Sequence, residues 1–221
     1  MNRAIVPFAL TLSLTAGLAP AEPAGGKEVH ITHGLPRVEV LHHGKLIVVE
    51  RNPDTDNMID PDFALTSRPC PPYCILPMTL AEGVETLGEL ELLAYLQKIG
   101  KDNSLMLIDS RDGDWPQRSG LIPGAINLPW QQLHPSHASA DEIAEILEFR
   151  FGAVRQGSLW NFSNAKTLVL YCNGPWCGQS PTNIKQLLAL GYPPHKIKWY
   201  RGGIQEWKAL GLTTVPLEKQ P

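Results

Sequence analysis

The sequence has little of what marks nucleic-acid-binding or membrane-spanning proteins. Charged residues are 19% of the 221 residues, the formal net charge is -3, and the Lys and Arg residues form no basic stripe. This distribution argues against nucleic acid as a partner. Beyond the N-terminus, no segment is apolar enough to span a bilayer. Hydrophobic residues, at 43%, are nevertheless abundant enough for an ordinary globular core.

The N-terminal residues have the pattern of an export signal. Arg3 gives a positive start, residues 4–19 are apolar or small, and residues 19–21 fit a small-x-small cleavage site. The apolar run is shorter than the roughly 20 residues that a spanning helix needs, which disfavours a retained membrane anchor. We therefore predict a cleaved signal peptide over residues 1–21, a periplasmic location and no membrane insertion after cleavage.

Cysteine is scarce, and export changes how the few cysteines are interpreted. The four are Cys70, Cys74, Cys172 and Cys177. An oxidising compartment permits disulfides, and four cysteines allow three pairings. Because the cysteines form two pairs that are close in sequence, the first expectation is the local pairing, Cys70 with Cys74 and Cys172 with Cys177.

Residues 22–85 are predicted to form an extension that packs on a main domain. Two apolar runs, residues 38–41 and 46–49, flank a short Gly-containing turn and predict a β-hairpin. An irregular polar stretch follows. The next segment, from Cys70 to Cys74, cannot be a regular helix because it contains two adjacent prolines. It is either a disulfide-braced loop or a redox partner for the second cysteine pair, and its spacing disfavours a zinc site.

From residue 86 onward, predicted strands and helices alternate. Apolar runs at residues 105–108, 167–171 and 197–200 are typical of strands that are buried on both faces. Such alternation indicates an α/β fold, with a mostly parallel sheet flanked by helices.

Three helices are predicted between and after these strands. Two follow capping boxes at residues 86–89 and 139–142, and the third follows a Ser-Pro pair at residues 180–181, with Ser180 as N-cap. Their inward faces are assigned to Leu90, Leu93 and Ala94; to Ile143, Ile146 and Leu147; and to Ile184, Leu187 and Leu188.

Cys172 directly follows the predicted strand at residues 167–171, and a helix is ready to start a few residues later. Ligands gather at the carboxyl ends of parallel strands. A loop that leads into a helix points backbone N–H groups inward, and these donors favour negative charge, as does the helix dipole. Gly174 and Gly178 let this loop curl tightly. We therefore predict that the thiol pKa of Cys172 is lowered and that Cys172 is nucleophilic.

Residues 86–217 resemble a rhodanese domain through four motifs in the expected order. A loop with a second cysteine and a tryptophan also resembles a subgroup of exported single-domain rhodanese-like proteins. The motifs are Leu-Ile-Asp-Ser-Arg at residues 107–111, Gly-Leu-Ile-Pro-Gly-Ala at residues 120–125 with Leu121 in place of the usual histidine, the Cys-Asn-Gly-Pro-Trp-Cys loop at residues 172–177, and the closing Gly-Gly…Trp…Gly pattern at residues 202–211.

The resemblance implies a five-stranded, mostly parallel sheet flanked by helices, preceded here by the hairpin and irregular extension. It also implies that the loop cysteine takes a sulfur atom from a donor such as thiosulfate, holds it as a persulfide against the loop N–H groups, and passes it to cyanide or a thiol. The nucleophile is then Cys172. The residues expected to bind or brace the substrate are Asn173, Gly174, Pro175, Trp176, Gly178, Asp109 and Arg111, of which the last two match the family's structural Asp-x-Arg pair.

Two departures from the family pattern concern the loop: it lacks the usual arginine, and it carries a second cysteine, Cys177. Its usual arginine, five residues after the cysteine, is replaced by Cys177, and no residue from Cys172 to Ser180 is basic. Thiosulfate therefore loses a charge-assisted contact of roughly 1.5–3 kcal/mol. A phosphatase is disfavoured because the arginine that related phosphatases carry six residues after the cysteine is Gly178 here. Trp176 either walls the pocket or packs against the domain.

Cys177 leaves several functions open. It can resolve a persulfide on Cys172 and release sulfide, or it can form a permanent structural bridge with Cys172. The leading hypothesis is a periplasmic sulfurtransferase or persulfide carrier. The alternatives are a thiol–disulfide redox protein or sensor that uses both cysteines, and a binding module without catalysis. We expect a small sulfur-containing donor and a thiol acceptor as partners, with a periplasmic redox protein as a further one, and no metal or cofactor.

Overall fold

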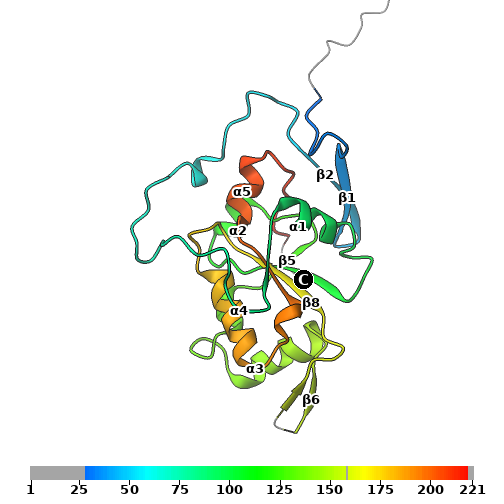
Figure 1. Ribbon diagram of the computed structural model, residues 1–221, viewed down its shortest axis with the longest axis vertical. Coiled ribbons are helices and arrows are strands. Elements are labelled where there is room, and N and C mark those ends of the chain that lie inside the picture. Colours follow the sequence, from blue (N-terminus) through cyan, green and yellow to red (C-terminus); the bar gives the residue numbers. More distant parts are fainter. Residues whose placement is uncertain (1–27, 158, 219–221) are drawn as a thin grey trace, which may run out of the picture.

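A parallel five-stranded sheet lies at the centre of the computed structural model, which describes residues 28–218 except residue 158 (Figure 1). The predicted signal peptide therefore lies outside the described residues. In spatial order the strands are β3 (Glu85–Leu87), β9 (Ile197–Tyr200), β8 (Thr167–Tyr171), β4 (Leu105–Asp109) and β5 (Ala125–Asn127). Every neighbouring pair is parallel, so the predicted α/β fold is confirmed.

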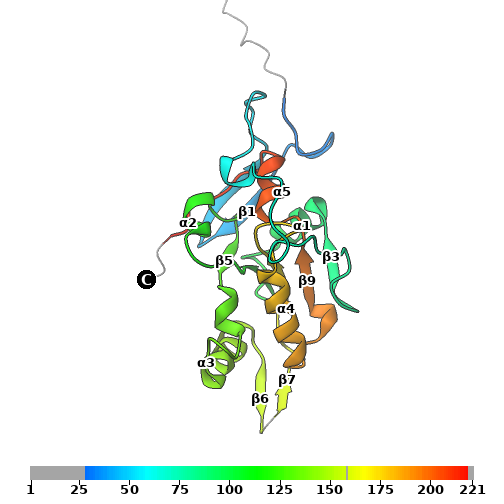
Figure 2. The same ribbon diagram turned by 90° about the vertical axis from the view of Figure 1, so that its left-hand side faces the viewer.

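Helices cover both faces of the sheet. The regular ones are α1 (Glu89–Leu96), α2 (Trp115–Ser119), α3 (Ala140–Glu145), α4 (Gln179–Ala189) and α5 (Gly203–Ala209). A π-helical stretch, Ile146–Arg150, continues α3, and short 3-10 turns occur at Pro61–Phe63, Trp130–Leu133 and Pro194–Lys196. Figure 2 shows α4 and α5 from the side. No helix among the described residues is both long enough and apolar enough to cross a membrane.

The core consists of two layers separated by the sheet. Side chains alternate across β8, so Val169 and Tyr171 pack with α1 and α5, whereas Leu168 and Leu170 pack with α3 and α4. All four are fully buried. A strand that is buried on both faces must be apolar throughout, which is why this run was recognisable in the sequence.

The extension begins with the predicted hairpin, which is confirmed. Its strands are β1 (Arg37–His42) and β2 (Lys45–Glu50), paired in antiparallel register. Val40 and Val49 join the core layer that contains α1 and α5. Residues 51–84 then run past α5 to the start of α4 (Figure 1).

A second hairpin projects from the far end of the molecule and was not predicted. It comprises β6 (Val154–Gln156) and β7 (Leu159–Asn161). Val154 and Leu159 are exposed, so this hairpin lacks the buried, alternating face that reveals a strand in a sequence.

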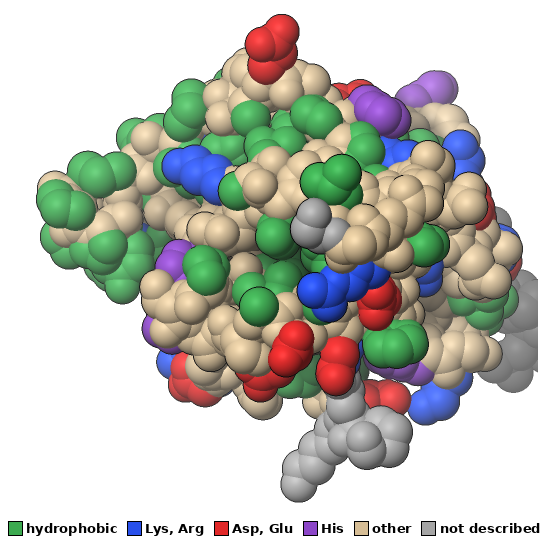
Figure 3. Space-filling model, turned by 90° about the horizontal axis from the view of Figure 1, so that it is seen from below, with side chains coloured by type: hydrophobic (Ala, Val, Ile, Leu, Met, Phe, Trp, Pro, Cys, Tyr) green, Lys and Arg blue, Asp and Glu red, His purple; other side chains and the backbone are tan. Residues whose placement is uncertain are grey.

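On the face seen from below in Figure 1, hydrophobic, acidic and basic side chains are interspersed (Figure 3).

The start of α1 differs from the prediction. Thr86 belongs to β3, where it pairs with Trp199, so it does not cap a helix. The helix begins after Gly88, whose N–H donates to the Glu91 carboxylate at 3.1 Å. The inward face is consequently shifted: Leu90 and Ala94 are exposed, and Leu92, Leu93 and Leu96 are buried. No strand was predicted here, because β3 is defined by its pairing with β9, which is distant in the sequence.

The start of α3 agrees with the prediction. Ser139 Oγ accepts a hydrogen bond from the Glu142 N–H at 3.3 Å, and the Glu142 carboxylate accepts one from the Ser139 N–H at 2.7 Å. Ile143 and Leu147 are buried, and Ile146 is half-buried. This cap needs only residues that are neighbours in sequence, so it was predictable.

Candidate functional site

The loop from Cys172 to Gly178 connects the carboxyl end of β8 to α4. Next to it, the carboxyl end of β4 continues into residues 110–112, and the Ser110 N–H donates to the Tyr171 carbonyl at 2.9 Å. The loop therefore lies at the edge of the sheet where parallel α/β proteins bind ligands.

Ser180 was predicted to be the N-cap of α4, and this is wrong. The helix begins two residues earlier, with Gly178 as N-cap. Ser180 is fully buried, its hydroxyl donates to Cys172 Sγ at 3.2 Å, and it accepts a hydrogen bond from Trp199 Nε1 at 3.2 Å. The Ser180 side chain therefore lies inside the helix, where its hydroxyl binds the cysteine sulfur, and it does not act as the cap.

Cys172 lies at the base of the loop with 2% of its surface exposed. Burial alone would raise the pKa of its thiol. Hydrogen bonds from the Cys177 thiol, from the Ser180 hydroxyl and N–H, and from the Asn173 N–H act in the opposite direction and prevail, so the pKa lies below the ordinary cysteine value. Donors at a strand-to-helix junction thus favour a thiolate at this position, which is the property predicted from the sequence.

Cys177 differs from Cys172 in both orientation and pKa. Both residues are free thiols, so the expected Cys172–Cys177 disulfide is not present. A turn is closed by the Cys177 N–H and the Gly174 carbonyl, at 2.9 Å, and the Cys177 carbonyl accepts a hydrogen bond from the Cys172 thiol at 3.2 Å. The Cys177 thiol lies 3.8 Å from Gln179 Oε1. Burial, and hydrogen bonding to Cys172, raise its pKa well above the ordinary value.

A cavity of about 440 Å³ opens beside this loop. Among the predicted substrate-binding residues, Asn173, Trp176 and Gly178 line it, as does Cys177. Cys172, Gly174 and Pro175 are not part of its wall. The other lining residues are Pro72, Tyr73, Asp112, Trp115, Trp130, Gln179 and Thr182.

The start of α5 holds the loop from behind. Backbone N–H groups of Ile204 and Gln205 donate to the carbonyls of Cys172 and Asn173 at 3.0 and 2.9 Å. Gly203, at φ +61°, packs so closely that a Cβ there would lie 2.7 Å from the Gly174 nitrogen, which excludes other residues. Gln205 Oε1 also accepts a hydrogen bond from Trp176 Nε1 at 2.6 Å. The Gly-Gly motif therefore positions the loop.

Asp109 and Arg111 were included among the substrate-binding residues, but neither lines the cavity. Both are fully buried and form a two-pronged ion pair, with Arg111 Nε 2.8 Å from Asp109 Oδ1 and Nη2 2.5 Å from Oδ2. Arg111 also donates to Ser119 Oγ and to the Gly120 carbonyl, each at 2.6 Å. The contacts with Ser119 and Gly120 tie the end of β4 to the segment around α2, and the ion pair with Asp109 holds the Arg111 side chain in position for them.

Asp112 is a site residue that the sequence analysis missed. One carboxylate oxygen accepts hydrogen bonds from Trp130 Nε1 at 3.0 Å and from Gln131 Nε2 at 2.5 Å, and the other accepts one from the Gln179 amide. Gln179 links this carboxylate to Cys177. The only signal in the sequence was that Asp112 follows a strand end, at the same edge of the sheet as the cysteine loop.

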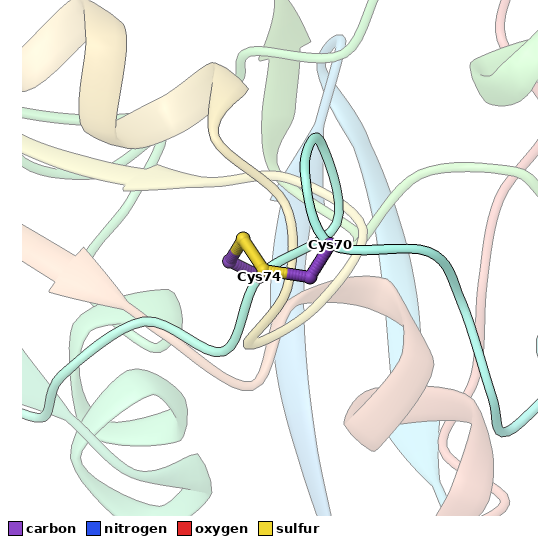
Figure 4. Close-up of a disulfide and its surroundings, with 2 residues drawn as sticks. All are labelled: Cys70 and Cys74. Atoms are coloured by element: carbon purple, nitrogen blue, oxygen red, sulfur yellow. A yellow bond between two sulfur atoms is a disulfide. The ribbon is translucent and has the colours of Figure 1, made fainter.

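The disulfide loop of the extension forms another wall of the cavity. Cys70 and Cys74 are joined by a disulfide, the pairing expected from the sequence (Figure 4). The Tyr73 ring, inside this loop, meets the Trp176 ring edge-to-face at 5.5 Å. Farther along, the Leu76 N–H donates to the Pro175 carbonyl at 2.8 Å. The extension therefore contacts the cysteine loop directly, and Trp176 both lines the cavity and packs.

No group of three or more His, Cys, Asp or Glu side chains within the described part of the chain is arranged to hold a metal ion. The site as described combines a thiol at a loop rich in hydrogen-bond donors with an adjacent aromatic cavity. These parts can stabilise a sulfur anion and enclose a small molecule.

Solved structures offer distant likenesses to this chain. One is a Rhodopseudomonas palustris protein of unknown function, described as a possible tyrosine phosphatase, at 23% identity and a TM-score of 0.39, covering 62% of this chain and 90% of that protein. A Lactobacillus plantarum protein matches at 19% identity and a TM-score of 0.37, covering 60% and 88%. The 3-mercaptopyruvate sulfotransferase of Escherichia coli matches at 21% identity and a TM-score of 0.35, covering 52% of this chain and 39% of the enzyme.

The family assignment comes from a comparison with family models. No curated protein matches the chain. The model of the rhodanese-like domain matches residues 92–210, which lie inside the segment 86–217 that was predicted from the motifs. Because the match spans more than half of the chain and includes β8, the cysteine loop and α4, the protein belongs to the rhodanese-like domain family.

Proposed function

We propose that the protein is a periplasmic sulfurtransferase or persulfide carrier in which Cys172 takes up a sulfane sulfur. In this step the Cys172 thiolate attacks the outer sulfur of a donor R–S–SH. The donor S–S bond breaks, R–S⁻ leaves, and Cys172 becomes a persulfide. Attack of an acceptor thiol on the outer sulfur then returns Cys172 to the thiolate and yields a new persulfide. The two steps transfer one sulfur atom from the donor to the acceptor, and they need no external oxidant or reductant.

The observation that carries this proposal is the position of Cys172 at a strand-to-helix junction, where the buried Ser180 hydroxyl donates a hydrogen bond to its Sγ at 3.2 Å. A thiolate is the nucleophile in sulfur exchange, and a cysteine with hydrogen-bond donors around it at a helix start supplies one. The same donors, the Ser180 hydroxyl and the loop N–H groups, support the negative charge of a persulfide. Membership of the rhodanese-like domain family is consistent with this chemistry.

Access to Cys172 requires a movement of Cys177. Cys177 lines the cavity, whereas Cys172 lies beneath it and is almost fully buried. A donor in the cavity therefore meets Cys172 only when the Cys177 side chain turns aside. Cys177 can also attack a persulfide on Cys172, which forms a Cys172–Cys177 disulfide and releases H₂S.

Native mass spectrometry tests the proposal. The reduced protein is incubated separately with thiosulfate, inorganic polysulfide and benzyl hydropersulfide. Wild type should gain one sulfur or, after resolution, lose two hydrogens, and Cys177→Ser should accumulate the sulfur adduct. Peptide mapping should place the adduct on Cys172, and Cys172→Ser should gain none. Absence of an adduct on Cys177→Ser with all three donors would refute sulfur transfer.

The two adjacent free thiols also support a second candidate, a thiol–disulfide protein. They lie on one short loop and one of them faces the cavity, so a reversible bridge needs only a rearrangement of that loop. A redox titration separates the candidates. A bridge that forms reversibly near the potentials of catalytic disulfides, without any sulfur adduct in the previous experiment, favours the thiol–disulfide function.

A further inference from the structure

We propose that the cavity beside the cysteine loop selects sulfur donors whose organic group is apolar and carries no negative charge, and that Asp112 is the residue that excludes anions. This inference rests on the proposed sulfur transfer at Cys172. It names the class of donor, aryl or alkyl hydropersulfides, and one specificity-determining side chain.

The walls of the cavity are aromatic. Four aromatic side chains line it: Tyr73, Trp115, Trp130 and Trp176. Its volume of about 440 Å³ falls within the range of roughly 300–1,000 Å³ that is typical of sites for small organic molecules. A thiosulfate ion fills little of such a space, whereas an organic group stacked between rings buries apolar surface on several sides.

Asp112 is the charged member of that wall, and its charge is negative. Its three hydrogen-bond donors, Trp130, Gln131 and Gln179, are all neutral, so they fix the carboxylate without neutralising it. This fixed negative charge repels an anionic donor and tolerates a neutral one.

The nearby cations do not reverse this polarity. Arg68 stacks on Trp176 at 4.0 Å, and Arg118 stacks on Trp115 at 4.7 Å, but neither guanidinium lines the cavity. Arg118 also lies 3.5 Å from the carboxylates of both Asp62 and Asp114, which counter its charge. A dianion in the cavity therefore meets a carboxylate at the wall and cations only behind the aromatic rings.

The two donor classes undergo comparable reactions. Benzyl hydropersulfide gives its outer sulfur to the Cys172 thiolate and leaves as benzyl thiolate. Thiosulfate gives its outer sulfur and leaves as sulfite. Each reaction breaks one S–S bond and forms another, and total charge is conserved. The two donors differ in intrinsic reactivity because their leaving groups differ, so the change of the rate ratio between variants measures how the cavity treats the rest of the donor.

The test compares these rates in wild type, Asp112→Asn and Thr182→Arg. Wild type should react with benzyl hydropersulfide at least about tenfold faster than with thiosulfate. Removing the carboxylate charge, or adding a cation at the lining residue Thr182, should narrow the ratio about tenfold, mainly by speeding the thiosulfate reaction. Asp56→Asn is the matched control because Asp56 is an exposed acidic residue outside the cavity wall, and it should leave the ratio unchanged.

Two results would overturn the inference. One is equal reactivity of wild type toward both donors, and the other is a ratio that changes no more in Asp112→Asn and Thr182→Arg than in Asp56→Asn. Binding to unreactive Cys172→Ser, followed by tryptophan fluorescence, separates the inference from the proposed function. Stronger binding of benzyl mercaptan than of sulfite supports the selectivity even if no donor modifies Cys172, and binding of sulfite that is equal or stronger refutes it.

Discussion

At the scale of single residues, the reactivity of Cys172 depends on a balance between burial and hydrogen bonding. Burial opposes the charge of a thiolate, and the donors around the sulfur support it. Ser180 is the clearest of these donors because its hydroxyl is oriented by Trp199 and has no contact with solvent. Removing one donor should therefore shift the balance toward the neutral thiol.

We predict that Ser180→Ala raises the pKa of Cys172. At a pH below that pKa, fewer molecules then carry the thiolate, so alkylation at neutral pH slows and the midpoint of its pH profile moves upward. The measurement compares Cys177→Ser with Cys177→Ser/Ser180→Ala, so that one reactive loop thiol is followed. Ser163→Ala, an exposed serine outside the cavity wall, serves as control. An unchanged midpoint would contradict the role given to Ser180.

The Asp109–Arg111 pair has a structural role that mutation can reveal. We predict that Arg111→Ala lowers the free energy of unfolding by about 3–5 kcal/mol, because a buried carboxylate loses its partner. Lys45→Ala breaks an exposed ion pair with Glu218 and should have no resolvable effect. Urea denaturation measures both. A loss for Arg111→Ala that is no larger than that for Lys45→Ala would show that the pair does not brace β4.

At the scale of elements, the site is formed where the loop after β8 contacts three other segments of the chain. The loop after β8 carries both thiols, the start of α5 holds it from behind, the segment after β4 supplies Asp112, and the disulfide loop supplies Tyr73. The Cys70–Cys74 disulfide joins the two ends of the loop that carries Tyr73, and it thereby restricts the motion of one cavity wall.

We predict that Cys70→Ser/Cys74→Ser loosens this wall. The disulfide closes a short loop, so its removal should cost about 2 kcal/mol of stability. Amide hydrogen exchange in residues 70–76 should accelerate, and benzyl mercaptan should bind Cys172→Ser more weakly on this background because Tyr73 is no longer held against Trp176. Ile75→Ser, an exposed side chain in the same segment, is the control. Unchanged exchange and binding would show that the bond does not shape the cavity.

At the scale of the whole molecule, the parallel sheet divides the core into two layers, and the candidate site lies at the carboxyl ends of its strands β4 and β8. The extension crosses from the hairpin to these strand ends, so it is part of the site as well as of the core. Export remains a prediction from residues 1–21, which lie outside the described residues.

We predict that the full chain, expressed in a Gram-negative bacterium, accumulates in the periplasm with Glu22 as its first residue. A positive start, an apolar stretch and a small-x-small site direct export and cleavage. Intact mass and cell fractionation measure this, and a chain that begins at Glu22 after an added Met should stay in the cytoplasm. Recovery of uncleaved protein in the membrane fraction would instead identify residues 1–21 as an anchor.

The sequence by itself determined the features that depend on neighbouring residues. Apolar runs identified β4, β8 and β9, the Ser139 cap identified the start of α3, and the position of Cys172 after a strand indicated its lowered pKa. The hairpin of the extension was also predictable, because its pattern is complete within a few residues. These signals come from residues that are close together in the sequence, so they can be recognised without the tertiary structure.

Only the tertiary structure decided which side chains converge on the cavity and how the two loop thiols are oriented. Asp112, Tyr73, Trp130 and Gln179 are separated by long stretches of sequence and share one wall, while Arg111, next to Asp112, is directed into the core. The Cys177 carbonyl accepts a hydrogen bond from the Cys172 thiol, and the Cys177 thiol also lies 3.8 Å from Gln179 Oε1. Contacts of this kind follow from how distant elements pack, and no pattern along the chain records them.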